Sequence, residues 1–106
     1  MVSRFEVYLV NLDTEMTTDP KNTRPSVVIS PDEVNRNLDT AIIAPIATTR
    51  AEYPTRVAVD FLNGTRHVIL DQIRTVDQAR LVKKIGEIDE ASRPMIIERL
   101  QELFAE

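Results

Sequence analysis

Apolar residues gather in short segments along the chain, and most of these segments predict β-strands. Phe5, Val7 and Leu9 recur at every second position, which places them on one face of an extended strand. The second segment, residues 25–30, is almost wholly apolar, which is typical of a strand that is buried and does not lie on the surface. The predicted strands cover residues 5–12, 25–30, 41–46, 55–61 and 65–70, with one further candidate at 81–88.

Turn and loop signals separate these strands. Residues 13–23 form a long polar stretch, and long loops in compact domains are usually functional or mobile. Residues 31–39 and 48–54 predict two further loops. Pro45 is expected to end the third strand, because proline cannot donate to a ladder. Asn63-Gly64 predicts a hairpin turn, in which both turn residues take a positive φ.

The C-terminus changes from strand to helix periodicity. Ile96, Leu100 and Leu103 share one helical face, which predicts an amphipathic helix over residues 92–105. Ser92 is the expected N-cap of this helix. Five or six strands followed by one helix predict a mainly β fold, a small barrel with the helix packed on its side. The 106 residues fit one domain, spanning 1–106.

Composition narrows the classes of protein. The chain is 42% apolar and 28% charged, as in ordinary globular domains. It has no cysteine, which excludes disulfides and suits a reducing cytoplasm. The sequence contains no run of 18 apolar residues, so it predicts no membrane-spanning helix. The net charge of −4 argues against general electrostatic binding to nucleic acid, but it leaves room for a local basic groove.

Few residues point to chemistry. One histidine and no cysteine leave no metal-binding spacing, and His67 alone on a strand is interpreted as a surface or packing residue. Arg24 stands where the long loop meets an apolar strand, so its guanidinium either binds phosphate or pairs with a carboxylate. Residues 74–84 hold four basic side chains and one acidic one. This basic segment either follows a phosphate backbone or is a solvated face.

The order of several segments resembles the MazF/PemK family of toxins from bacterial toxin–antitoxin systems. The most specific match combines Arg24-Pro25, opening an apolar strand, with the later Asp-Gln-Ile-Arg-Thr element. The segments come in family order and cover nearly the whole chain. They are Val7 to Asp13, Thr23 to Pro31, Asn35-Arg36, Ala41 to Ile46, Tyr53 to Val57, Leu70 to Asp77 and Arg80-Leu81.

The resemblance implies an SH3-like barrel, a homodimer and sequence-specific cleavage of single-stranded RNA through its 2′-hydroxyl, without metal or cofactor. It also implies an antitoxin partner whose acidic C-terminal tail occupies the RNA groove. Arg24 matches the principal catalytic residue of the family, and a threonine just after the third strand is its usual companion. The residues expected to bind RNA are Thr17, Thr18, Lys21, Asn22, Asp71, Gln72 and Arg74.

The chain departs from the family pattern at two places. Ala47 occupies the position of the catalytic threonine, so Thr48 is the expected substitute for the missing hydroxyl. The first loop reads Met16-Thr17-Thr18-Asp19-Pro20, where the family commonly has a Gly-Ser-Glu group. That loop often helps to choose the RNA sequence, so the cleavage motifs of the family are not transferred to this chain.

Two alternatives to a ribonuclease remain open. Ala47 favours a catalytically weakened binding module that keeps the barrel and the contacts with an antitoxin. Gyrase poisons share the same barrel, but they typically depend on residues at the end of the C-terminal helix. Here that end lacks a distinctive terminal aromatic residue, since it reads Leu103-Phe104-Ala105-Glu106.

Overall fold

The computed structural model describes residues 2–12, 23–48, 56–61 and 64–105. Within these residues, two α-helices and two short 3₁₀ turns accompany seven strands. The elements are β1 (Glu6–Asn11), β2 (Thr23–Val28), α1 (Asp32–Asn37), β3 (Thr40–Ala47), β4 (Arg56–Phe61), β5 (Gly64–Ile69), η2 (Leu70–Gln72), β6 (Arg74–Asp77), η3 (Gln78–Arg80), β7 (Leu81–Glu87) and α2 (Arg93–Phe104).

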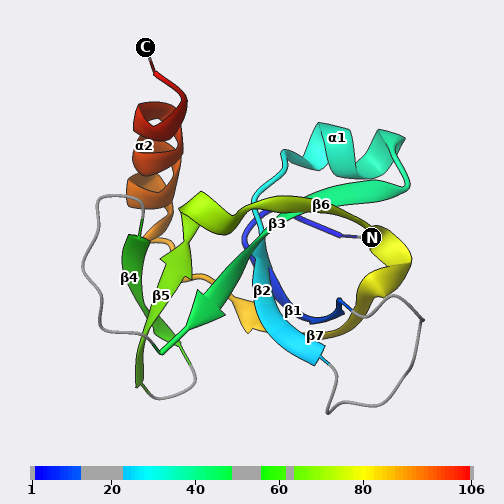
Figure 1. The fold of residues 1–106 in the computed structure, drawn as a ribbon, viewed down its shortest axis with the longest axis horizontal. Coiled ribbons are helices and arrows are strands. Elements are labelled where there is room, and N and C mark those ends of the chain that lie inside the picture. Colours follow the sequence, from blue (N-terminus) through cyan, green and yellow to red (C-terminus); the bar gives the residue numbers. More distant parts are fainter. Residues whose placement is uncertain (1, 13–22, 49–55, 62–63, 106) are drawn as a thin grey trace.

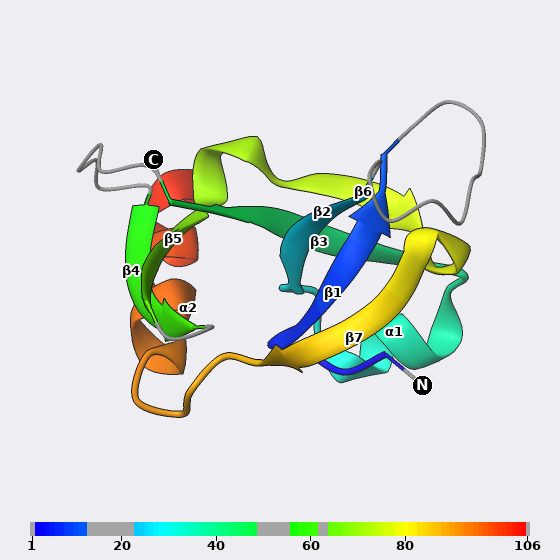
Figure 2. The same ribbon diagram turned by 90° about the horizontal axis from the view of Figure 1, so that it is seen from below.

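The strands form one strongly curled sheet, which confirms the predicted mainly β fold with a C-terminal helix. Their order is β4-β5-β3-β2-β1-β7, and β6 pairs with β3 beside this path. Figures 1 and 2 show α2 against β4 and β5 at one end of the molecule and α1 at the other. The sequence predicts five or six strands, and the described residues contain one more, β6, which the hydrophobic pattern does not predict.

β3 connects the two halves of the sheet. Its first residues pair with β6, up to Ile43 opposite Arg74, and its last residues pair with β5, from Ile46 opposite Val68. Pro45 lies between these two ladders, where no pair with either strand is recorded, and it stands opposite Ser26 of β2. The prediction that Pro45 ends the strand is wrong, because the missing N–H falls where β3 changes partner.

Apolar side chains pack on both faces of the sheet. Adjacent residues of β2 show this, since Val27 belongs to one core cluster and Val28 to the other, and both are fully buried. The larger cluster includes Val7, Ile46, Val68 and, from α2, Ile96, with Leu100 and Leu103 beside it. The smaller one contains Val2, Val10, Val28, Ala41, Ile43 and Val76.

The predicted C-terminal helix is confirmed to within a residue. Its apolar face packs through Ile96, Leu100 and Leu103, as the periodicity indicates. Ser92 precedes the first helical residue, but its side chain makes no capping bond. Its hydroxyl instead contacts the carboxylate of Asp89 at 2.9 Å. Ser92 is thus the N-cap residue, as predicted, but its hydroxyl does not cap the helix because it bonds to Asp89.

Residues 31–39 contain a helix where the sequence predicts only a polar loop. α1 is short and polar, and it depends on a buried side chain, Asn35. The amide of Asn35 accepts a hydrogen bond from the Ser30 hydroxyl at 2.5 Å and donates one to the Ser30 carbonyl at 3.0 Å. Such a helix has no apolar periodicity that could predict it.

The β4–β5 hairpin forms as predicted, but its turn lies one residue earlier. Phe61 pairs with Gly64, so Gly64 already belongs to β5. Gly64 does not have a positive φ, which makes that prediction wrong. The two connecting residues, 62 and 63, lie outside the described residues.

Close packing against Gly86 of β7 leads to a prediction. A Cβ at this position would lie 2.7 Å from the ring of Phe61, which is buried. Gly86→Ala is therefore expected to lower the free energy of unfolding by about 1–3 kcal/mol, as overpacking does. Urea denaturation measures the change. Gly64→Ala is the matched control, because nothing lies within 4 Å of its added methyl group. Equal stability of the two variants would contradict the packing described here.

Candidate functional site

Arg24 lies near the start of β2, opposite Val10 of β1. Its side chain is exposed, and its guanidinium Nη1 donates a hydrogen bond to the carbonyl of Thr23 at 3.0 Å. Within the described part of the chain, no ion pair of Arg24 is recorded. The strand thus presents a fixed positive charge to solvent.

The end of β3 carries Ala47, where the chain departs from the family pattern, and next to it Thr48, the expected substitute. Ala47 is the last residue of the strand and pairs with His67 of β5. Thr48 follows it and is exposed. The recorded pairing of β2 with β3 stops at Ser26 and Pro45, and the two strands separate beyond that point in Figure 1. The recorded pairing therefore does not set Arg24 opposite Thr48.

The Asp-Gln-Ile-Arg element divides between two places. Asp71 and Gln72 lie in η2, where the carboxylate of Asp71 stands 3.9 Å from the guanidinium Nε of Arg56. Arg74 begins β6 and lines an open cavity of about 300 Å³. The other residues that line this cavity are Leu12, Thr40, Thr75, Val76, Asp77 and Arg80.

The cavity beside β6 carries positive charge from Arg74 and Arg80 and one negative charge from Asp77. Arg80 is held in place, since its Nη1 donates a hydrogen bond to the carbonyl of Asn11 at the end of β1, at 3.1 Å. The sequence placed Arg80 in the basic segment and in the family resemblance, but not among the residues expected to bind RNA. Its position beside Arg74 depends on the pairing of β6 with β3.

The remaining residues expected to bind RNA lie outside the described residues. These are Thr17, Thr18, Lys21 and Asn22. The basic side chains of residues 74–84 do not lie together on one surface. Lys84 is ion-paired on β7, while Arg74 and Arg80 line the cavity. Among the described residues, no group of three His, Cys, Asp or Glu side chains could hold a metal ion.

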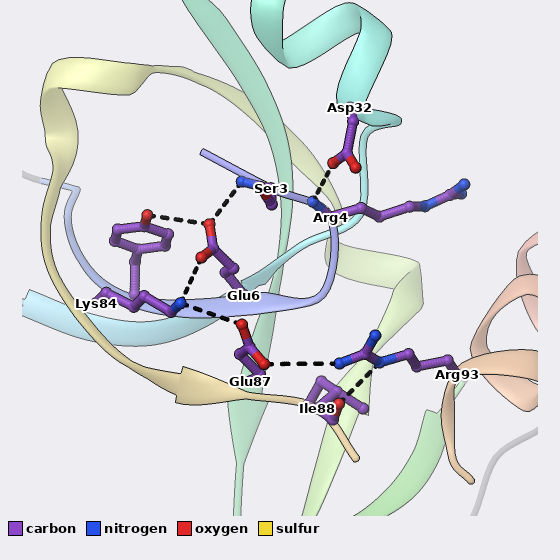
Figure 3. A network of polar contacts seen from close by, with 9 residues as sticks. Ser3, Arg4, Glu6, Asp32, Lys84, Glu87, Ile88 and Arg93 are labelled. Atoms are coloured by element: carbon purple, nitrogen blue, oxygen red, sulfur yellow. Dashed lines mark hydrogen bonds and ion pairs between the residues drawn. The ribbon is translucent and has the colours of Figure 1, made fainter. Parts of the chain in front are cut away.

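Lys84 of β7 belongs to a polar network with Glu6 of β1 and Glu87 (Figure 3). Its ammonium lies 2.5 Å from the carboxylate of Glu6 and 3.1 Å from that of Glu87. Glu6 also accepts hydrogen bonds from the backbone N–H of Ser3 at 2.6 Å and from the hydroxyl of Tyr8 at 3.2 Å. Burial would raise the pKa of Glu6, but these donors outweigh it and hold the pKa below its ordinary value.

The lowered pKa of Glu6 leads to a prediction about acid stability. A carboxyl whose pKa is lower in the folded state stabilises the fold above its unfolded pKa, and this contribution is lost as the pH falls through the folded pKa. Glu6→Gln should therefore lower the free energy of unfolding at pH 7 by about 1–3 kcal/mol and should cost less at acidic pH. Urea denaturation at several pH values from neutral to acidic measures this. Glu98→Gln, an exposed change on α2, is the control, and an equal pH dependence in both variants would contradict the assignment.

Known proteins resemble this chain in sequence. The family model described as "PemK-like, MazF-like toxin of type II toxin-antitoxin system" matches residues 3–104. "Endoribonuclease EndoA" of Bacillus subtilis is 34% identical over 95% of this chain and 92% of its own length. "Endoribonuclease MazF" of Staphylococcus epidermidis is 32% identical over 86% of this chain and 81% of its own length.

A solved structure supports the same conclusion. "Endoribonuclease in complex with its cognate antitoxin from Mycobacterial species" matches with a TM-score of 0.81 and 25% identity, over 96% of this chain and 93% of that chain. The curled β-sheet with one C-terminal helix is thus a fold shared with this toxin. The chain belongs to the PemK-like, MazF-like family of toxins of type II toxin–antitoxin systems. The predicted family is confirmed.

Proposed function

We propose that the protein is the toxin of a type II toxin–antitoxin system and cleaves single-stranded RNA at specific sequences. Two relatives that are 32–34% identical are named endoribonucleases, which supports the reaction class. The observation that carries the proposal is Arg24, an exposed guanidinium without an acidic partner in the described residues, at the family's catalytic position.

The reaction makes use of the chemistry of RNA itself. The 2′-hydroxyl loses its proton as its oxygen attacks the adjacent phosphorus, and the bond to the 5′ oxygen breaks. The 5′ oxygen takes up a proton, so the products are a 2′,3′-cyclic phosphate and a 5′-hydroxyl. The protein has to orient the chain and stabilise the negative charge that gathers on the phosphate oxygens. Arg24 supplies a permanent positive charge, and the exposed hydroxyl of Thr48 supplies a hydrogen bond. This scheme uses no metal and no cofactor.

RNA binding involves surfaces beyond Arg24. Arg74 lines the cavity beside β6, with Arg80 next to it, and both side chains suit phosphate. Asp71 and Gln72 precede this strand and offer groups for base edges. The proposal also includes Thr17, Thr18, Lys21 and Asn22 in the first loop.

An antitoxin with an acidic C-terminal tail is the proposed protein partner. The solved mycobacterial relative is named as a complex with its cognate antitoxin, which supports this class of partner. The arginine-lined cavity offers positive charge to such a tail. We place the pair in the cytoplasm. In the described residues, no helix is long and apolar enough to cross a membrane.

A homodimer is the proposed assembly. Exposed apolar side chains remain on α2, where Met95 is 42% and Phe104 69% exposed. Such surface is commonly covered by a second copy. Light scattering at micromolar concentration should therefore give about twice the 12.1 kDa mass of one chain. A species of 12.1 kDa alone would contradict the dimer.

Incubation of the purified protein with a mixed RNA pool in the presence of EDTA tests the activity. We expect cleavage at a small set of sequences, which sequencing of the new ends identifies. An intact pool, together with high-affinity binding of an acidic antitoxin peptide, would instead favour the weakened binding module. Ala47 is the observation that favours this second candidate, since the structure places a methyl group at the end of β3.

A further inference from the structure

The strand pairing aligns one continuous face across the middle of the sheet. Side chains of directly opposed residues in antiparallel strands point to the same side. Ser26 is opposite Pro45, Ala47 is opposite His67, and His67 is opposite Ala58 of β4. Alternation places Pro45 and Ala47 on the same side of β3, and Arg24 and Ser26 on the same side of β2. His67 and Arg24 therefore belong to one face.

Two polar atoms on this face have no hydrogen-bond partner in the structure. They are the hydroxyl oxygen of Ser26, a residue that is 1% exposed, and the ring atom Nδ1 of His67. Buried polar atoms nearly always have a partner, and a missing one calls for an explanation such as a bound molecule. His67 is only half-buried, so the rest of its ring can be reached.

The neighbours of His67 leave space around its ring. On both sides along this face its partners are alanines, Ala47 on β3 and Ala58 on β4. Directly opposed residues have Cβ atoms about 4.5–5.5 Å apart, so an imidazole on β5 can reach over the methyl group of Ala47. In the family pattern that position holds the threonine hydroxyl. Thr48 lies beyond the last residue of β3, so the recorded pairing places Ala47 and not Thr48 opposite His67.

We propose that His67 binds the RNA backbone and supplies from β5 the hydrogen bond that Ala47 cannot supply from β3. This inference rests on the proposed ribonuclease function and adds a substrate-contacting residue to it. RNA that lies along this face contacts Arg24 and His67 on either side of β3. The charged groups near His67 are Arg56 and Asp60 on β4 and Asp71 in η2, so both signs of charge surround it.

Single-turnover cleavage of an oligonucleotide that contains the mapped cut site tests this role. We expect His67→Ala and His67→Gln to slow cleavage by about tenfold or more, the loss of one hydrogen bond to a charged group. Thr65→Ala is the matched control, because Thr65 lies on the same strand and face, is exposed, and should stay within about twofold of the wild type. Adding Ala47→Thr to His67→Ala should recover most of the lost rate. A merely structural histidine would show no such recovery.

Nuclear magnetic resonance gives a second measurement that does not depend on cleavage. The chain has one histidine, so its imidazole signals are unambiguous. A random 2′-O-methyl RNA pool, which lacks the attacking hydroxyl, should shift these signals in the wild type. If the wild type cuts no RNA, the proposed function fails, and this measurement still decides whether His67 contacts RNA. Unmoved imidazole signals, or wild-type cleavage by His67→Ala, would overturn the proposal.

Discussion

Replacing Arg24 with alanine is expected to reduce RNA cleavage by about a hundredfold or more, because its charge acts on the phosphate as negative charge develops there. The fold should be unaffected, since the side chain is exposed and its described hydrogen bond goes only to the neighbouring carbonyl of Thr23. Single-turnover cleavage of the mapped site measures the effect, and circular dichroism with thermal unfolding monitors the fold.

Arg36→Ala provides the matched control for Arg24. Arg36 is also an exposed arginine, but it lies on α1, away from the β2 strand. The control should cut at the wild-type rate and lose no more stability than Arg24→Ala. Cleavage at the wild-type rate by Arg24→Ala would show that the catalytic assignment is wrong.

The second large effect concerns the end of β3. If the Thr48 hydroxyl bonds to the phosphate, Thr48→Val removes the donor at nearly constant shape and should slow cleavage by about ten- to a hundredfold. If Thr48 only bonds to its own backbone, as threonines often do, the variant should cut normally. Single-turnover rates separate these outcomes, and an unchanged rate would remove Thr48 from the site.

The reverse change, Ala47→Thr, tests whether the natural chain is a weakened enzyme. It returns a hydroxyl to the family position, beside His67 on the neighbouring strand. A large gain in rate would mark the natural protein as weakened. A small or absent gain would show that another group already provides this hydrogen bond, as the proposed role of His67 requires.

The spacing of apolar residues along the chain predicted the strands and the helix that bury one regular apolar face. Alternation at Phe5, Val7 and Leu9 predicted β1, and the spacing of Ile96, Leu100 and Leu103 predicted α2. The same patterns could not predict α1, which depends on buried hydrogen bonds of Asn35, or β6, a four-residue strand defined by its pairing with β3.

The candidate site shows the same division. Arg24 could be singled out from the sequence, because an arginine before a strand proline is a local motif. His67 could not be singled out in this way. Its proposed role depends on its position opposite Ala47, twenty positions away in the chain, and on a ring nitrogen without a hydrogen-bond partner. In the sequence it is one histidine on a strand, which is most often a packing residue.

The chemistry of the cut ends tests the central claim most directly. Purified protein with EDTA present should cut its mapped RNA site to give a 2′,3′-cyclic phosphate and a 5′-hydroxyl. The same RNA with a single 2′-O-methyl group at the cut nucleotide should stay intact, because the attacking hydroxyl is blocked. Arg24→Ala should leave both RNAs essentially uncut. Cleavage of the blocked RNA, or products with a 5′-phosphate, would contradict the account.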